Sequence, residues 1–471
     1  MVSLDERPSS VQAARGVQRK RFEELEGIWS EFGWVMGTPY PSRVRAFDPA
    51  DGSVRFERWT GGGNAEIILR GMRYYLEDNP RYLDDPEGEF WVERRGQGSM
   101  LYLRPPRGAD PRALRVEAGA WSDLIVGEQV HDLEICGLEF RWTTPAWDLD
   151  VVAWDFRTTP YTIRPEAQPA AIRFWGQVER LRLAHCRFED VVAGIRLRAT
   201  REGSSVQSVV IEDNEFRNCD VAAIHLSDGA GWGYSHPVGV LDDIAIYRNY
   251  ATNIGFRPTR YERGTAIGLD HVRRAHIAGN VVERSGAQAI NVVGGKGATR
   301  GEVPLVRVLV QQNKAWKTMQ NGNDFGGIES WQHGPVYIFN NLSHDARGQR
   351  EAERVLHGRH AGFGHAYYLD GGFKHYVFNN IAWGLSSDPS SPLVNCAAFQ
   401  EIIGFQIVFL NNTVWNYTVG SRRQAPEAGR NQYVGNVWQG ISERVFRHAE
   451  PAKTRPQGNE ADAAAAAGGG I

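Results

Sequence analysis

The sequence has few cysteines and little net charge, and each shortage excludes a class of protein. Four cysteines in 471 residues, at Cys136, Cys186, Cys219 and Cys396, are too few for a disulfide scaffold, and their spacing matches no zinc site. We therefore expect four free thiols. The formal net charge is −3 and 23% of residues are charged, so the composition indicates neither nucleic acid nor an anionic membrane as a partner.

Long apolar runs are also missing. The longest runs are strand-sized, which excludes a transmembrane helix, and the opening MVSLDERPSS lacks the apolar core of a signal peptide. Localisation stays open between the cytoplasm and, if a leader was removed, secretion or the periplasm; the oligomeric state is equally open. Glycine (52), tryptophan (15) and tyrosine (16) are abundant, which is typical of a turn-rich β protein with aromatic binding surfaces.

A repeat becomes visible when the chain is aligned on one asparagine. Segments such as VVIEDN, AHIAGN and VYIFNN end on this asparagine, and an apolar residue stands three positions before it. Cys136 and Cys186 are placed in the same register upstream, with Leu133 and Leu183 as their apolar residues. The aligned asparagines are Asn214, Asn249, Asn280, Asn313, Asn341, Asn380, Asn412 and Asn436.

A second register follows each asparagine, in segments such as AAIHLS and TAIGLD. The minimal period is about 22–23 residues, and alternate residues within each segment are apolar, which is typical of strands. The pattern predicts an all-β chain that forms a right-handed parallel β-helix of about ten coils, with the asparagines stacked in a buried turn. The second register consists of Ile172, Ile195, Ile224, Ile267, Ile290, Ile328 and Tyr367.

Four segments are expected along the chain. Residues 1–45 form a helical cap, with a helix at 12–30, and residues 46–118 form a β-rich segment whose GEFWVERRGQGSMLYLRPP stretch predicts a hairpin. Residues 119–445 form the β-helix, which we interpret as the catalytic domain. Residues 446–471 include ADAAAAAGGG and are expected to be disordered.

Insertions beyond the minimal coil all adjoin the strand of the second register. Long loops on one face of a repeat array usually build a binding site, so we expect a cleft over this strand. The insertions lie near 142–168, 229–240, 253–264, 294–304, 317–326, 344–364 and 384–395.

Candidate site residues follow from the alternation in that strand. Residues one and three positions after each core isoleucine should point outward, into the cleft, although a solvated sheet face would also be polar. These two columns contain Arg196, Arg198, His225, Asp270, Asn291, Glu329, Trp331, Tyr368 and Asp370.

Glu329 and Asp370 are the candidate catalytic pair. They fall on adjacent coils with an offset of two residues, which places their Cα atoms about 8 Å apart. Their carboxyl groups could then lie anywhere within the ~5–9.5 Å used by retaining and inverting glycosidases, so both outcomes stay open. Asp324 precedes the same strand and is a third candidate, whereas Asp270 lies three coils away, at about 14 Å, and suits another sugar subsite.

Aromatic and histidine side chains accompany these acids. Trp331 could stack on a sugar ring or pack against a loop. Six of the thirteen histidines lie between 333 and 375, where they could bind sugar hydroxyls, act as a base, ligate a metal or simply be solvated, although their spacing matches no metal motif.

The stretch from Asn313 to Gly384, with QNGNDFGGIESW, NNLSHD and AYYLDGG, resembles the β-helix glycosidases of glycoside hydrolase family 141. The hairpin segment is also similar to that family's N-terminal insert. The resemblance implies fucosidase-like or xylanase-like action on plant cell-wall glycans by two carboxylates, at Asp324 and Asp370, with His344 in the HD element. Gly371 stands where the family often has a second aspartate, and Glu329 where it often has an aromatic residue.

Three functions are therefore kept. The first is a glycoside hydrolase on a plant or microbial glycan, which needs no cofactor. The second is a polysaccharide lyase or uronate epimerase, for which Arg196, Arg198 and His225 matter more and calcium is a candidate cofactor. The third is a non-catalytic glycan-binding β-helix.

Overall fold

The computed structural model describes residues 44–48, 50–51, 53–56, 79–80, 83, 88–96, 98–144, 169–229, 238–256, 264–294, 307–320, 325–346, 348, 355–356, 359–360, 364–384, 396–402, 404–417, 419–424, 431–441 and 443–447. These residues form strands throughout, with no α-helix among them. No helix in this described part could cross a membrane. The expected helix at 12–30, the expected disordered tail and Asp324 lie outside these residues.

The chain divides into two compact units, of which the smaller contains residues 40–118. In this unit β3 (Glu89–Arg95) pairs antiparallel with β4 (Gly98–Arg104), and Arg95 lies opposite Gly98. This pairing confirms the predicted hairpin. A second antiparallel pair joins β1 (Val44–Asp48) to β2 (Ser53–Phe56).

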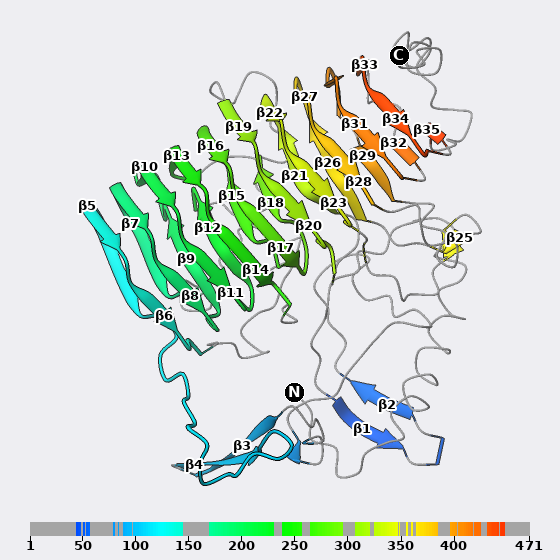
Figure 1. The fold of residues 1–471 in the computed structure, drawn as a ribbon. Coiled ribbons are helices and arrows are strands. Elements are labelled where there is room, and N and C mark those ends of the chain that lie inside the picture. The colour runs from blue at the N-terminus through cyan, green and yellow to red at the C-terminus, as the bar shows by residue number, and fades with distance from the viewer. Residues whose placement is uncertain are drawn as a thin grey trace. The chain divides into compact units, whose positions relative to one another are not determined.

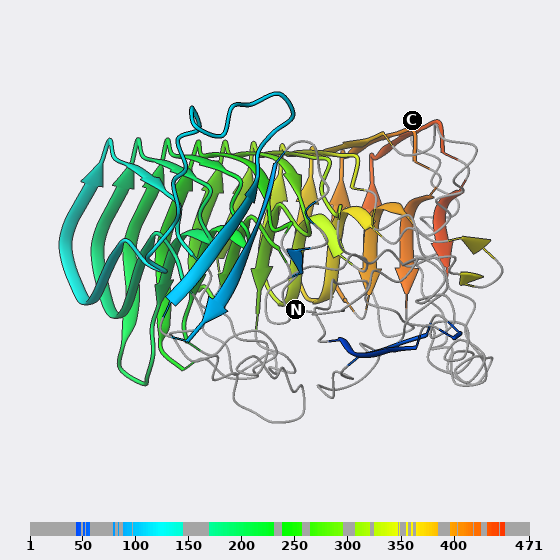
Figure 2. The ribbon, with the colours of Figure 1, turned by 90° about the horizontal axis from the view of Figure 1, so that it is seen from below.

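The larger unit is a right-handed parallel β-helix, as predicted (Figure 1). Its coils follow one another along a single axis, and equivalent strands lie side by side (Figure 2). Each coil contributes one strand to each of three parallel sheets, which we call sheets I, II and III. A short antiparallel pair, β24 (Val355–Leu356) and β25 (Arg359–His360), is added to the coils.

Sheet I holds the second register. It consists of the first halves of β5 (Ile125–Cys136) and β7 (Ile172–Ala184), then β9 (Ala193–Arg198), β12 (Ala222–Ser227), β15 (Ile267–Asp270), β18 (Ile290–Val293), β21 (Phe325–His333), β26 (Gly364–Gly372), β29 (Ala397–Ile402), β32 (Val419–Gln424) and β35 (Glu443–Arg447).

Sheet II holds the strands that precede the asparagines. It consists of the second halves of β5 and β7, then β10 (Ser205–Glu212), β13 (Val240–Tyr247), β16 (Arg274–Ala278), β19 (Arg307–Gln311), β22 (Val336–Phe339), β27 (Tyr376–Phe378), β30 (Val408–Leu410) and β33 (Gln432–Val434).

Sheet III holds the short strands that follow the asparagines. It consists of β6 (Glu139–Arg141), β8 (Arg187–Glu189), β11 (Glu215–Arg217), β14 (Tyr250–Ile254), β17 (Val281–Ser285), β20 (Lys314–Trp316), β23 (Leu342–His344), β28 (Ile381–Trp383), β31 (Thr413–Trp415) and β34 (Val437–Gln439).

The aligned asparagines form one buried column at the corner between sheets II and III. Each side chain bonds both neighbouring coils: Asn280 Nδ2 donates to Ile246 O at 2.9 Å and to Asn313 Oδ1 at 3.0 Å. Asn280 Oδ1 in turn accepts from the backbone N and the Nδ2 of Asn249, both at 3.0 Å. All eight asparagines of the column are at most 2% exposed, which confirms the predicted ladder.

The residue before each column asparagine has a left-handed backbone. Examples are Asp213, Asn340 and Asn379, with φ between 55° and 56°, and glycines occupy the same place at Gly279 and Gly435. Asparagine, aspartate and glycine tolerate this region best, which explains the recurrent NN, DN and GN pairs.

We expect Asn340→Val to destabilise the protein by about 1–2 kcal/mol, because a β-branched side chain is strained at positive φ. Asn340→Gly is the matched control and should cost much less. Urea unfolding of both variants measures the difference; equal midpoints would contradict the strain at this corner.

The register of the first coil differs from the prediction by two residues. Cys136 pairs with Ala184 and Ile135 with Leu183, so Leu138, not Cys136, occupies the place of Cys186. Cys186 does belong to the column, because its backbone N donates to Asn214 Oδ1 at 2.9 Å. The first coil contains no asparagine at this corner, and β5 bears an irregularity between Glu128 and Val130. The alignment of this coil therefore lacked the residue that sets the register in the later coils. All four cysteines are free thiols, as expected.

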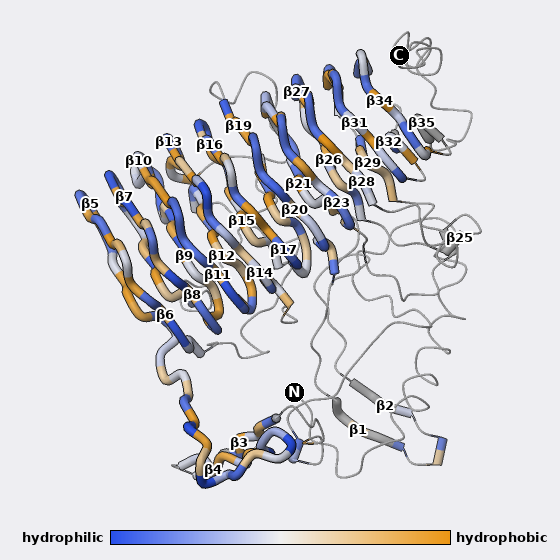
Figure 3. Tube along the Cα trace, viewed as in Figure 1, coloured by the Kyte–Doolittle hydropathy of each residue, from blue (hydrophilic) through white to orange (hydrophobic). Residues whose placement is uncertain are grey.

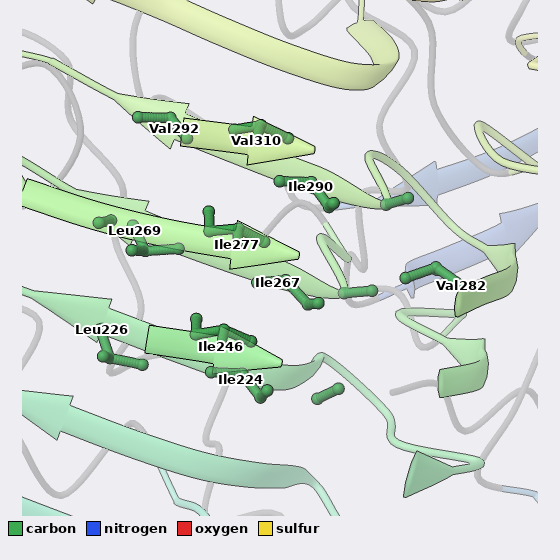
Figure 4. Packing of buried hydrophobic residues seen from close by; sticks show 14 of the residues in the cluster. Ile224, Leu226, Ile246, Ile267, Leu269, Ile277, Val282, Ile290, Val292 and Val310 are labelled. Carbon is green, nitrogen blue, oxygen red and sulfur yellow. The ribbon is translucent and has the colours of Figure 1, made fainter. Parts of the chain in front are cut away.

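The core lies between the three sheets and runs through all described coils. Polar and apolar residues alternate along the strands (Figure 3), and inward side chains stack on their equivalents in the next coil. Figure 4 shows this stacking for Ile224, Ile267 and Ile290 of sheet I beside Ile246, Ile277 and Val310 of sheet II.

The predicted insertions all enter or leave sheet I. By connectivity, the segments near 142–168, 253–264, 317–326, 344–364 and 384–395 join sheet III to sheet I, and those near 229–240 and 294–304 join sheet I to sheet II. The corner of the asparagine column carries none of them. Most of these segments lie outside the described residues, so the groove they were predicted to line stays a prediction.

Candidate functional site

The outward columns of sheet I are polar but largely buried. Register pairs Asn291 with Glu329, Glu329 with Tyr368, and Trp331 with Asp370, as the alignment predicted. Glu329 is 2% exposed, Asn291 6% and Trp331 7%, whereas Asp370 is half-buried. A solvated sheet face would leave such side chains exposed, so the burial sets this face apart.

Glu329 and Asp370 stand on the adjacent strands β21 and β26. Glu329 Oε2 accepts a hydrogen bond from the backbone N of Gly326 at 3.0 Å and one from Gln288 Nε2 at 3.1 Å. Both donors are N–H groups, an arrangement that fits an ionised carboxylate. Gln288, which is fully buried, was not among the predicted site residues; its position two residues before a core isoleucine gave no signal for this contact.

Three glycines near Glu329 and Asp370 allow neighbouring groups to approach the backbone closely. A Cβ on Gly326 would lie 2.7 Å from Tyr368 Cβ, and a Cβ on Gly327 2.6 Å from Ser343 Oγ. Gly371, at φ +66°, would place a Cβ 2.2 Å from Gln332 Nε2. The positive φ and this contact with the Gln332 amide both disfavour a side chain at position 371.

Asn291 and His365 add polar groups to the same region. Asn291 Oδ1 is buried and has no hydrogen-bond partner among the described residues, a condition that costs about 1–3 kcal/mol unless a ligand or water supplies the donor. His365 accepts a hydrogen bond at Nδ1 from the backbone N of Ala397 at 3.0 Å, and its ring lies 5.5 Å from that of Tyr368. Burial, aided by the charge of Arg422, holds the pKa of His365 well below its usual range.

A second polar cluster lies at the ends of β9, β12 and β15. His225 Nε2 contacts Asp270 Oδ2 at 3.2 Å across one coil, and the His225 side chain is 26% exposed. The neighbour of His225 in the next coil is Gly268, where a Cβ would lie 3.1 Å from His225 Cδ2. The missing side chain therefore lets the imidazole reach Asp270.

Asp228 and His271 form a parallel pair beside it. His271 Nδ1 lies 2.9 Å from Asp228 Oδ1, and Asp228 Oδ2 accepts from the backbone N of Val238 at 3.0 Å. Arg198 Nη2 donates to Gly229 O at 2.9 Å. Neither Asp228 nor His271 was predicted as a site residue, since both follow the strand positions that were read as outward columns.

The charges of this cluster depend on one another. Burial opposes ionisation of Asp270, but the charges of His225, His271 and Arg198 outweigh it, and the pKa of Asp270 is lowered. Burial also opposes protonation of His271, yet the hydrogen bond and charge of Asp228, with the charge of Asp270, raise its pKa above the usual 6.5. Burial lowers the pKa of the Arg198 guanidinium, against the charges of Asp270 and Asp228.

The raised pKa of His271 predicts a pH-dependent contribution to stability. The contribution is complete below the unfolded pKa and is lost as pH rises through the higher folded pKa. We expect His271→Gln to lower the free energy of unfolding more at about pH 5 than at about pH 9. Urea unfolding of both proteins at the two pH values measures this, and a larger loss at high pH would contradict it.

His344, another predicted site residue, lies outside both clusters. His344 belongs to sheet III, where its ring stacks between Trp316 at 5.9 Å and Trp383 at 4.6 Å, and its Nδ1 lies 3.1 Å from Asp345 Oδ2. The structure therefore places His344 outside the sheet I columns. Asp324 is not among the described residues, and within the described residues no three histidine, cysteine or acidic side chains are arranged to hold a metal ion.

No protein-family model matches the chain, and no curated protein matches its sequence. Two solved structures match, both with low TM-scores. A glycoside hydrolase is 17% identical over 58% of this chain and 38% of its own, with a TM-score of 0.35. A mannuronan C-5 epimerase A-module from Azotobacter vinelandii is 9% identical over 59% of this chain and 91% of its own, with a TM-score of 0.26. The match thus spans under two fifths of the glycoside hydrolase, and membership of family 141 stays a prediction.

Proposed function

We propose that the chain is a carbohydrate-active enzyme, specifically a glycoside hydrolase that binds its glycan along sheet I. One observation carries the proposal: a buried carboxylate, Glu329, accepts two N–H hydrogen bonds on the strand next to a half-buried acid, Asp370. Most glycoside hydrolases use a pair of acidic side chains, and two acids on adjacent coils can supply this pair.

The two acids receive different roles. Glu329, held ready to accept, acts as nucleophile or as the base that activates water, and Asp370 protonates the departing glycosidic oxygen. Asp324 is the alternative partner of Asp370, as the resemblance to family 141 implies. In this proposal Asn291 Oδ1, which is buried and has no partner among the described residues, accepts a hydrogen bond from a sugar hydroxyl, and Trp331, opposite Asp370, supplies an apolar wall.

A second candidate, a lyase or epimerase, is favoured by the other cluster. Proton abstraction beside a sugar carboxylate needs a base next to a cation, and His225, held by Asp270 and near Arg198, has that composition. The non-catalytic reading stays as the third candidate.

The test incubates the full chain with a panel of plant and microbial glycans. Hydrolysis predicts new reducing ends without the ultraviolet absorbance of an unsaturated uronate. If ultraviolet absorbance rises with each new reducing end, the reaction is an elimination and the chain is a lyase rather than a hydrolase. Binding without turnover on every glycan would favour a non-catalytic protein.

A further inference from the structure

The cluster at the ends of β9, β12 and β15 is not used by the proposed hydrolysis. It lies one to three coils from Asn291, the neighbour of Glu329, and β15 is separated from β21 by two strand spacings, about 10 Å. A glycan lying across the strands of sheet I would pass both groups of residues. The cluster is therefore placed to contact a sugar residue away from the cleaved bond.

Some residues of this cluster are buried, and others are accessible to a ligand. Asp228 is fully buried, the His271 side chain is 5% exposed, and their contact ties β12 to β15. His225 and Arg198 are the partly exposed members, and Asp270 is the one hydrogen-bond partner of His225 among the described residues. Because Nε2 faces Asp270, Nδ1 is the ring nitrogen left for a ligand.

The chemistry of the cluster suits an anion. Arg196, which is buried, stands directly beside His225 in the preceding coil, and Arg198 lies near both carboxylates, so the cluster contains two guanidinium groups. Asp270 fixes the ring of His225 and Asp228 fixes the ring of His271, as supporting carboxylates commonly do for histidine. Guanidinium groups match the planar, two-oxygen shape of a carboxylate.

We propose that Arg196, Arg198 and His225, supported by Asp270 and Asp228, form a subsite for the carboxylate of an acidic sugar, so that the substrate is a uronate-containing glycan. The inference rests on the proposal that sheet I binds a glycan. It does not depend on how the glycosidic bond is broken.

The experiment measures binding of the full chain to oligogalacturonate, oligomannuronate and oligoglucuronate by calorimetry. Each ligand is paired with its carboxyl-reduced form, in which only the charge and one oxygen are lost. At least one uronate should bind about tenfold or more tightly than its reduced form, a difference of about 1.4 kcal/mol that a hydrogen bond to a charged group can supply. A sulfated neutral oligosaccharide serves as a third ligand.

Variants locate the effect. Arg198→Gln and His225→Gln should each remove most of the preference for the uronate while binding of the reduced ligand is unchanged, and Arg198→Lys should keep part of it. Arg274→Gln, on the exposed face of sheet II, is the matched control and should keep the full preference. Urea unfolding shows whether each variant is folded. If Arg198→Gln does not fold, Arg198→Lys and His225→Gln still decide the test.

The outcomes separate this inference from the proposed function. Equal binding of uronate and reduced ligands, tighter binding of the sulfated ligand, or no binding at all would overturn the subsite. A uronate preference that depends on Arg198 and His225, with no hydrolysis of any glycan, would uphold the subsite and reject the hydrolase. Hydrolysis of neutral glycans alone would uphold the hydrolase and reject the uronate subsite.

Discussion

Asp370→Asn should lower turnover on a confirmed substrate by about three orders of magnitude, with the fold intact. An amide cannot donate the proton that the leaving oxygen requires, and acid–base groups contribute about 10²–10⁴-fold to such reactions. Asparagine has nearly the same shape as aspartate, and Asp370 is only half-buried, so the free energy of unfolding should change little. Initial rates measured at saturating substrate, with unfolding curves alongside, give both quantities.

The partner of Asp370 is decided by the same measurement on two further variants. Glu329→Gln keeps an oxygen that can accept from Gly326 N and Gln288 Nε2, so its loss of activity would be chemical rather than structural. The true partner, Glu329 or Asp324, should lose a similar factor as an amide, and the bystander should lose little. Asp243→Asn, on the exposed part of sheet II, is the control. Near-full activity of Asp370→Asn would show that the site lies elsewhere.

The largest effect on stability is expected at the asparagine column. Asn280→Leu keeps the number and branching of the side-chain heavy atoms but removes five hydrogen bonds, and it leaves Ile246 O and Asn249 N unpaired between coils. Each buried unpaired backbone group costs about 1–3 kcal/mol, so the two together should lower the free energy of unfolding severalfold more than a surface change.

Urea unfolding at constant temperature measures the loss. Arg274→Leu introduces the same side chain on the exposed face of the adjoining strand β16 and is expected to cost little, because its ion pair with Asp242 is solvent-exposed. A midpoint for Asn280→Leu equal to that of the wild type would mean that the column does not hold the coils together.

The sequence predicted the fold through its most repetitive positions. From Asn214 onward, each aligned apolar residue pairs with its predicted equivalent, for example Ile246 with Ile277 and Val377 with Phe409. The first coil was wrong by two residues because it lacks the asparagine that fixes the register elsewhere. Where a coil carries the repeated residue, the alignment is secure; where it does not, apolar residues alone allow a shift of two without changing face.

The candidate site was predicted less completely. The pairing of Trp331 with Asp370 and of Glu329 with Tyr368 followed from the register. The contacts of Glu329 with Gln288, of Asp228 with His271, and the stacking of His344 in sheet III did not.

By itself, then, the sequence determined the coil, the asparagine column and the two outward columns of sheet I, because a period-two strand and a repeated corner are local properties of the chain. Only the tertiary structure decided which side chains meet between coils and which are buried. His225 reaches Asp270 because Gly268 leaves a gap between neighbouring coils, and a gap of this kind depends on how strands separated by 45 residues stack.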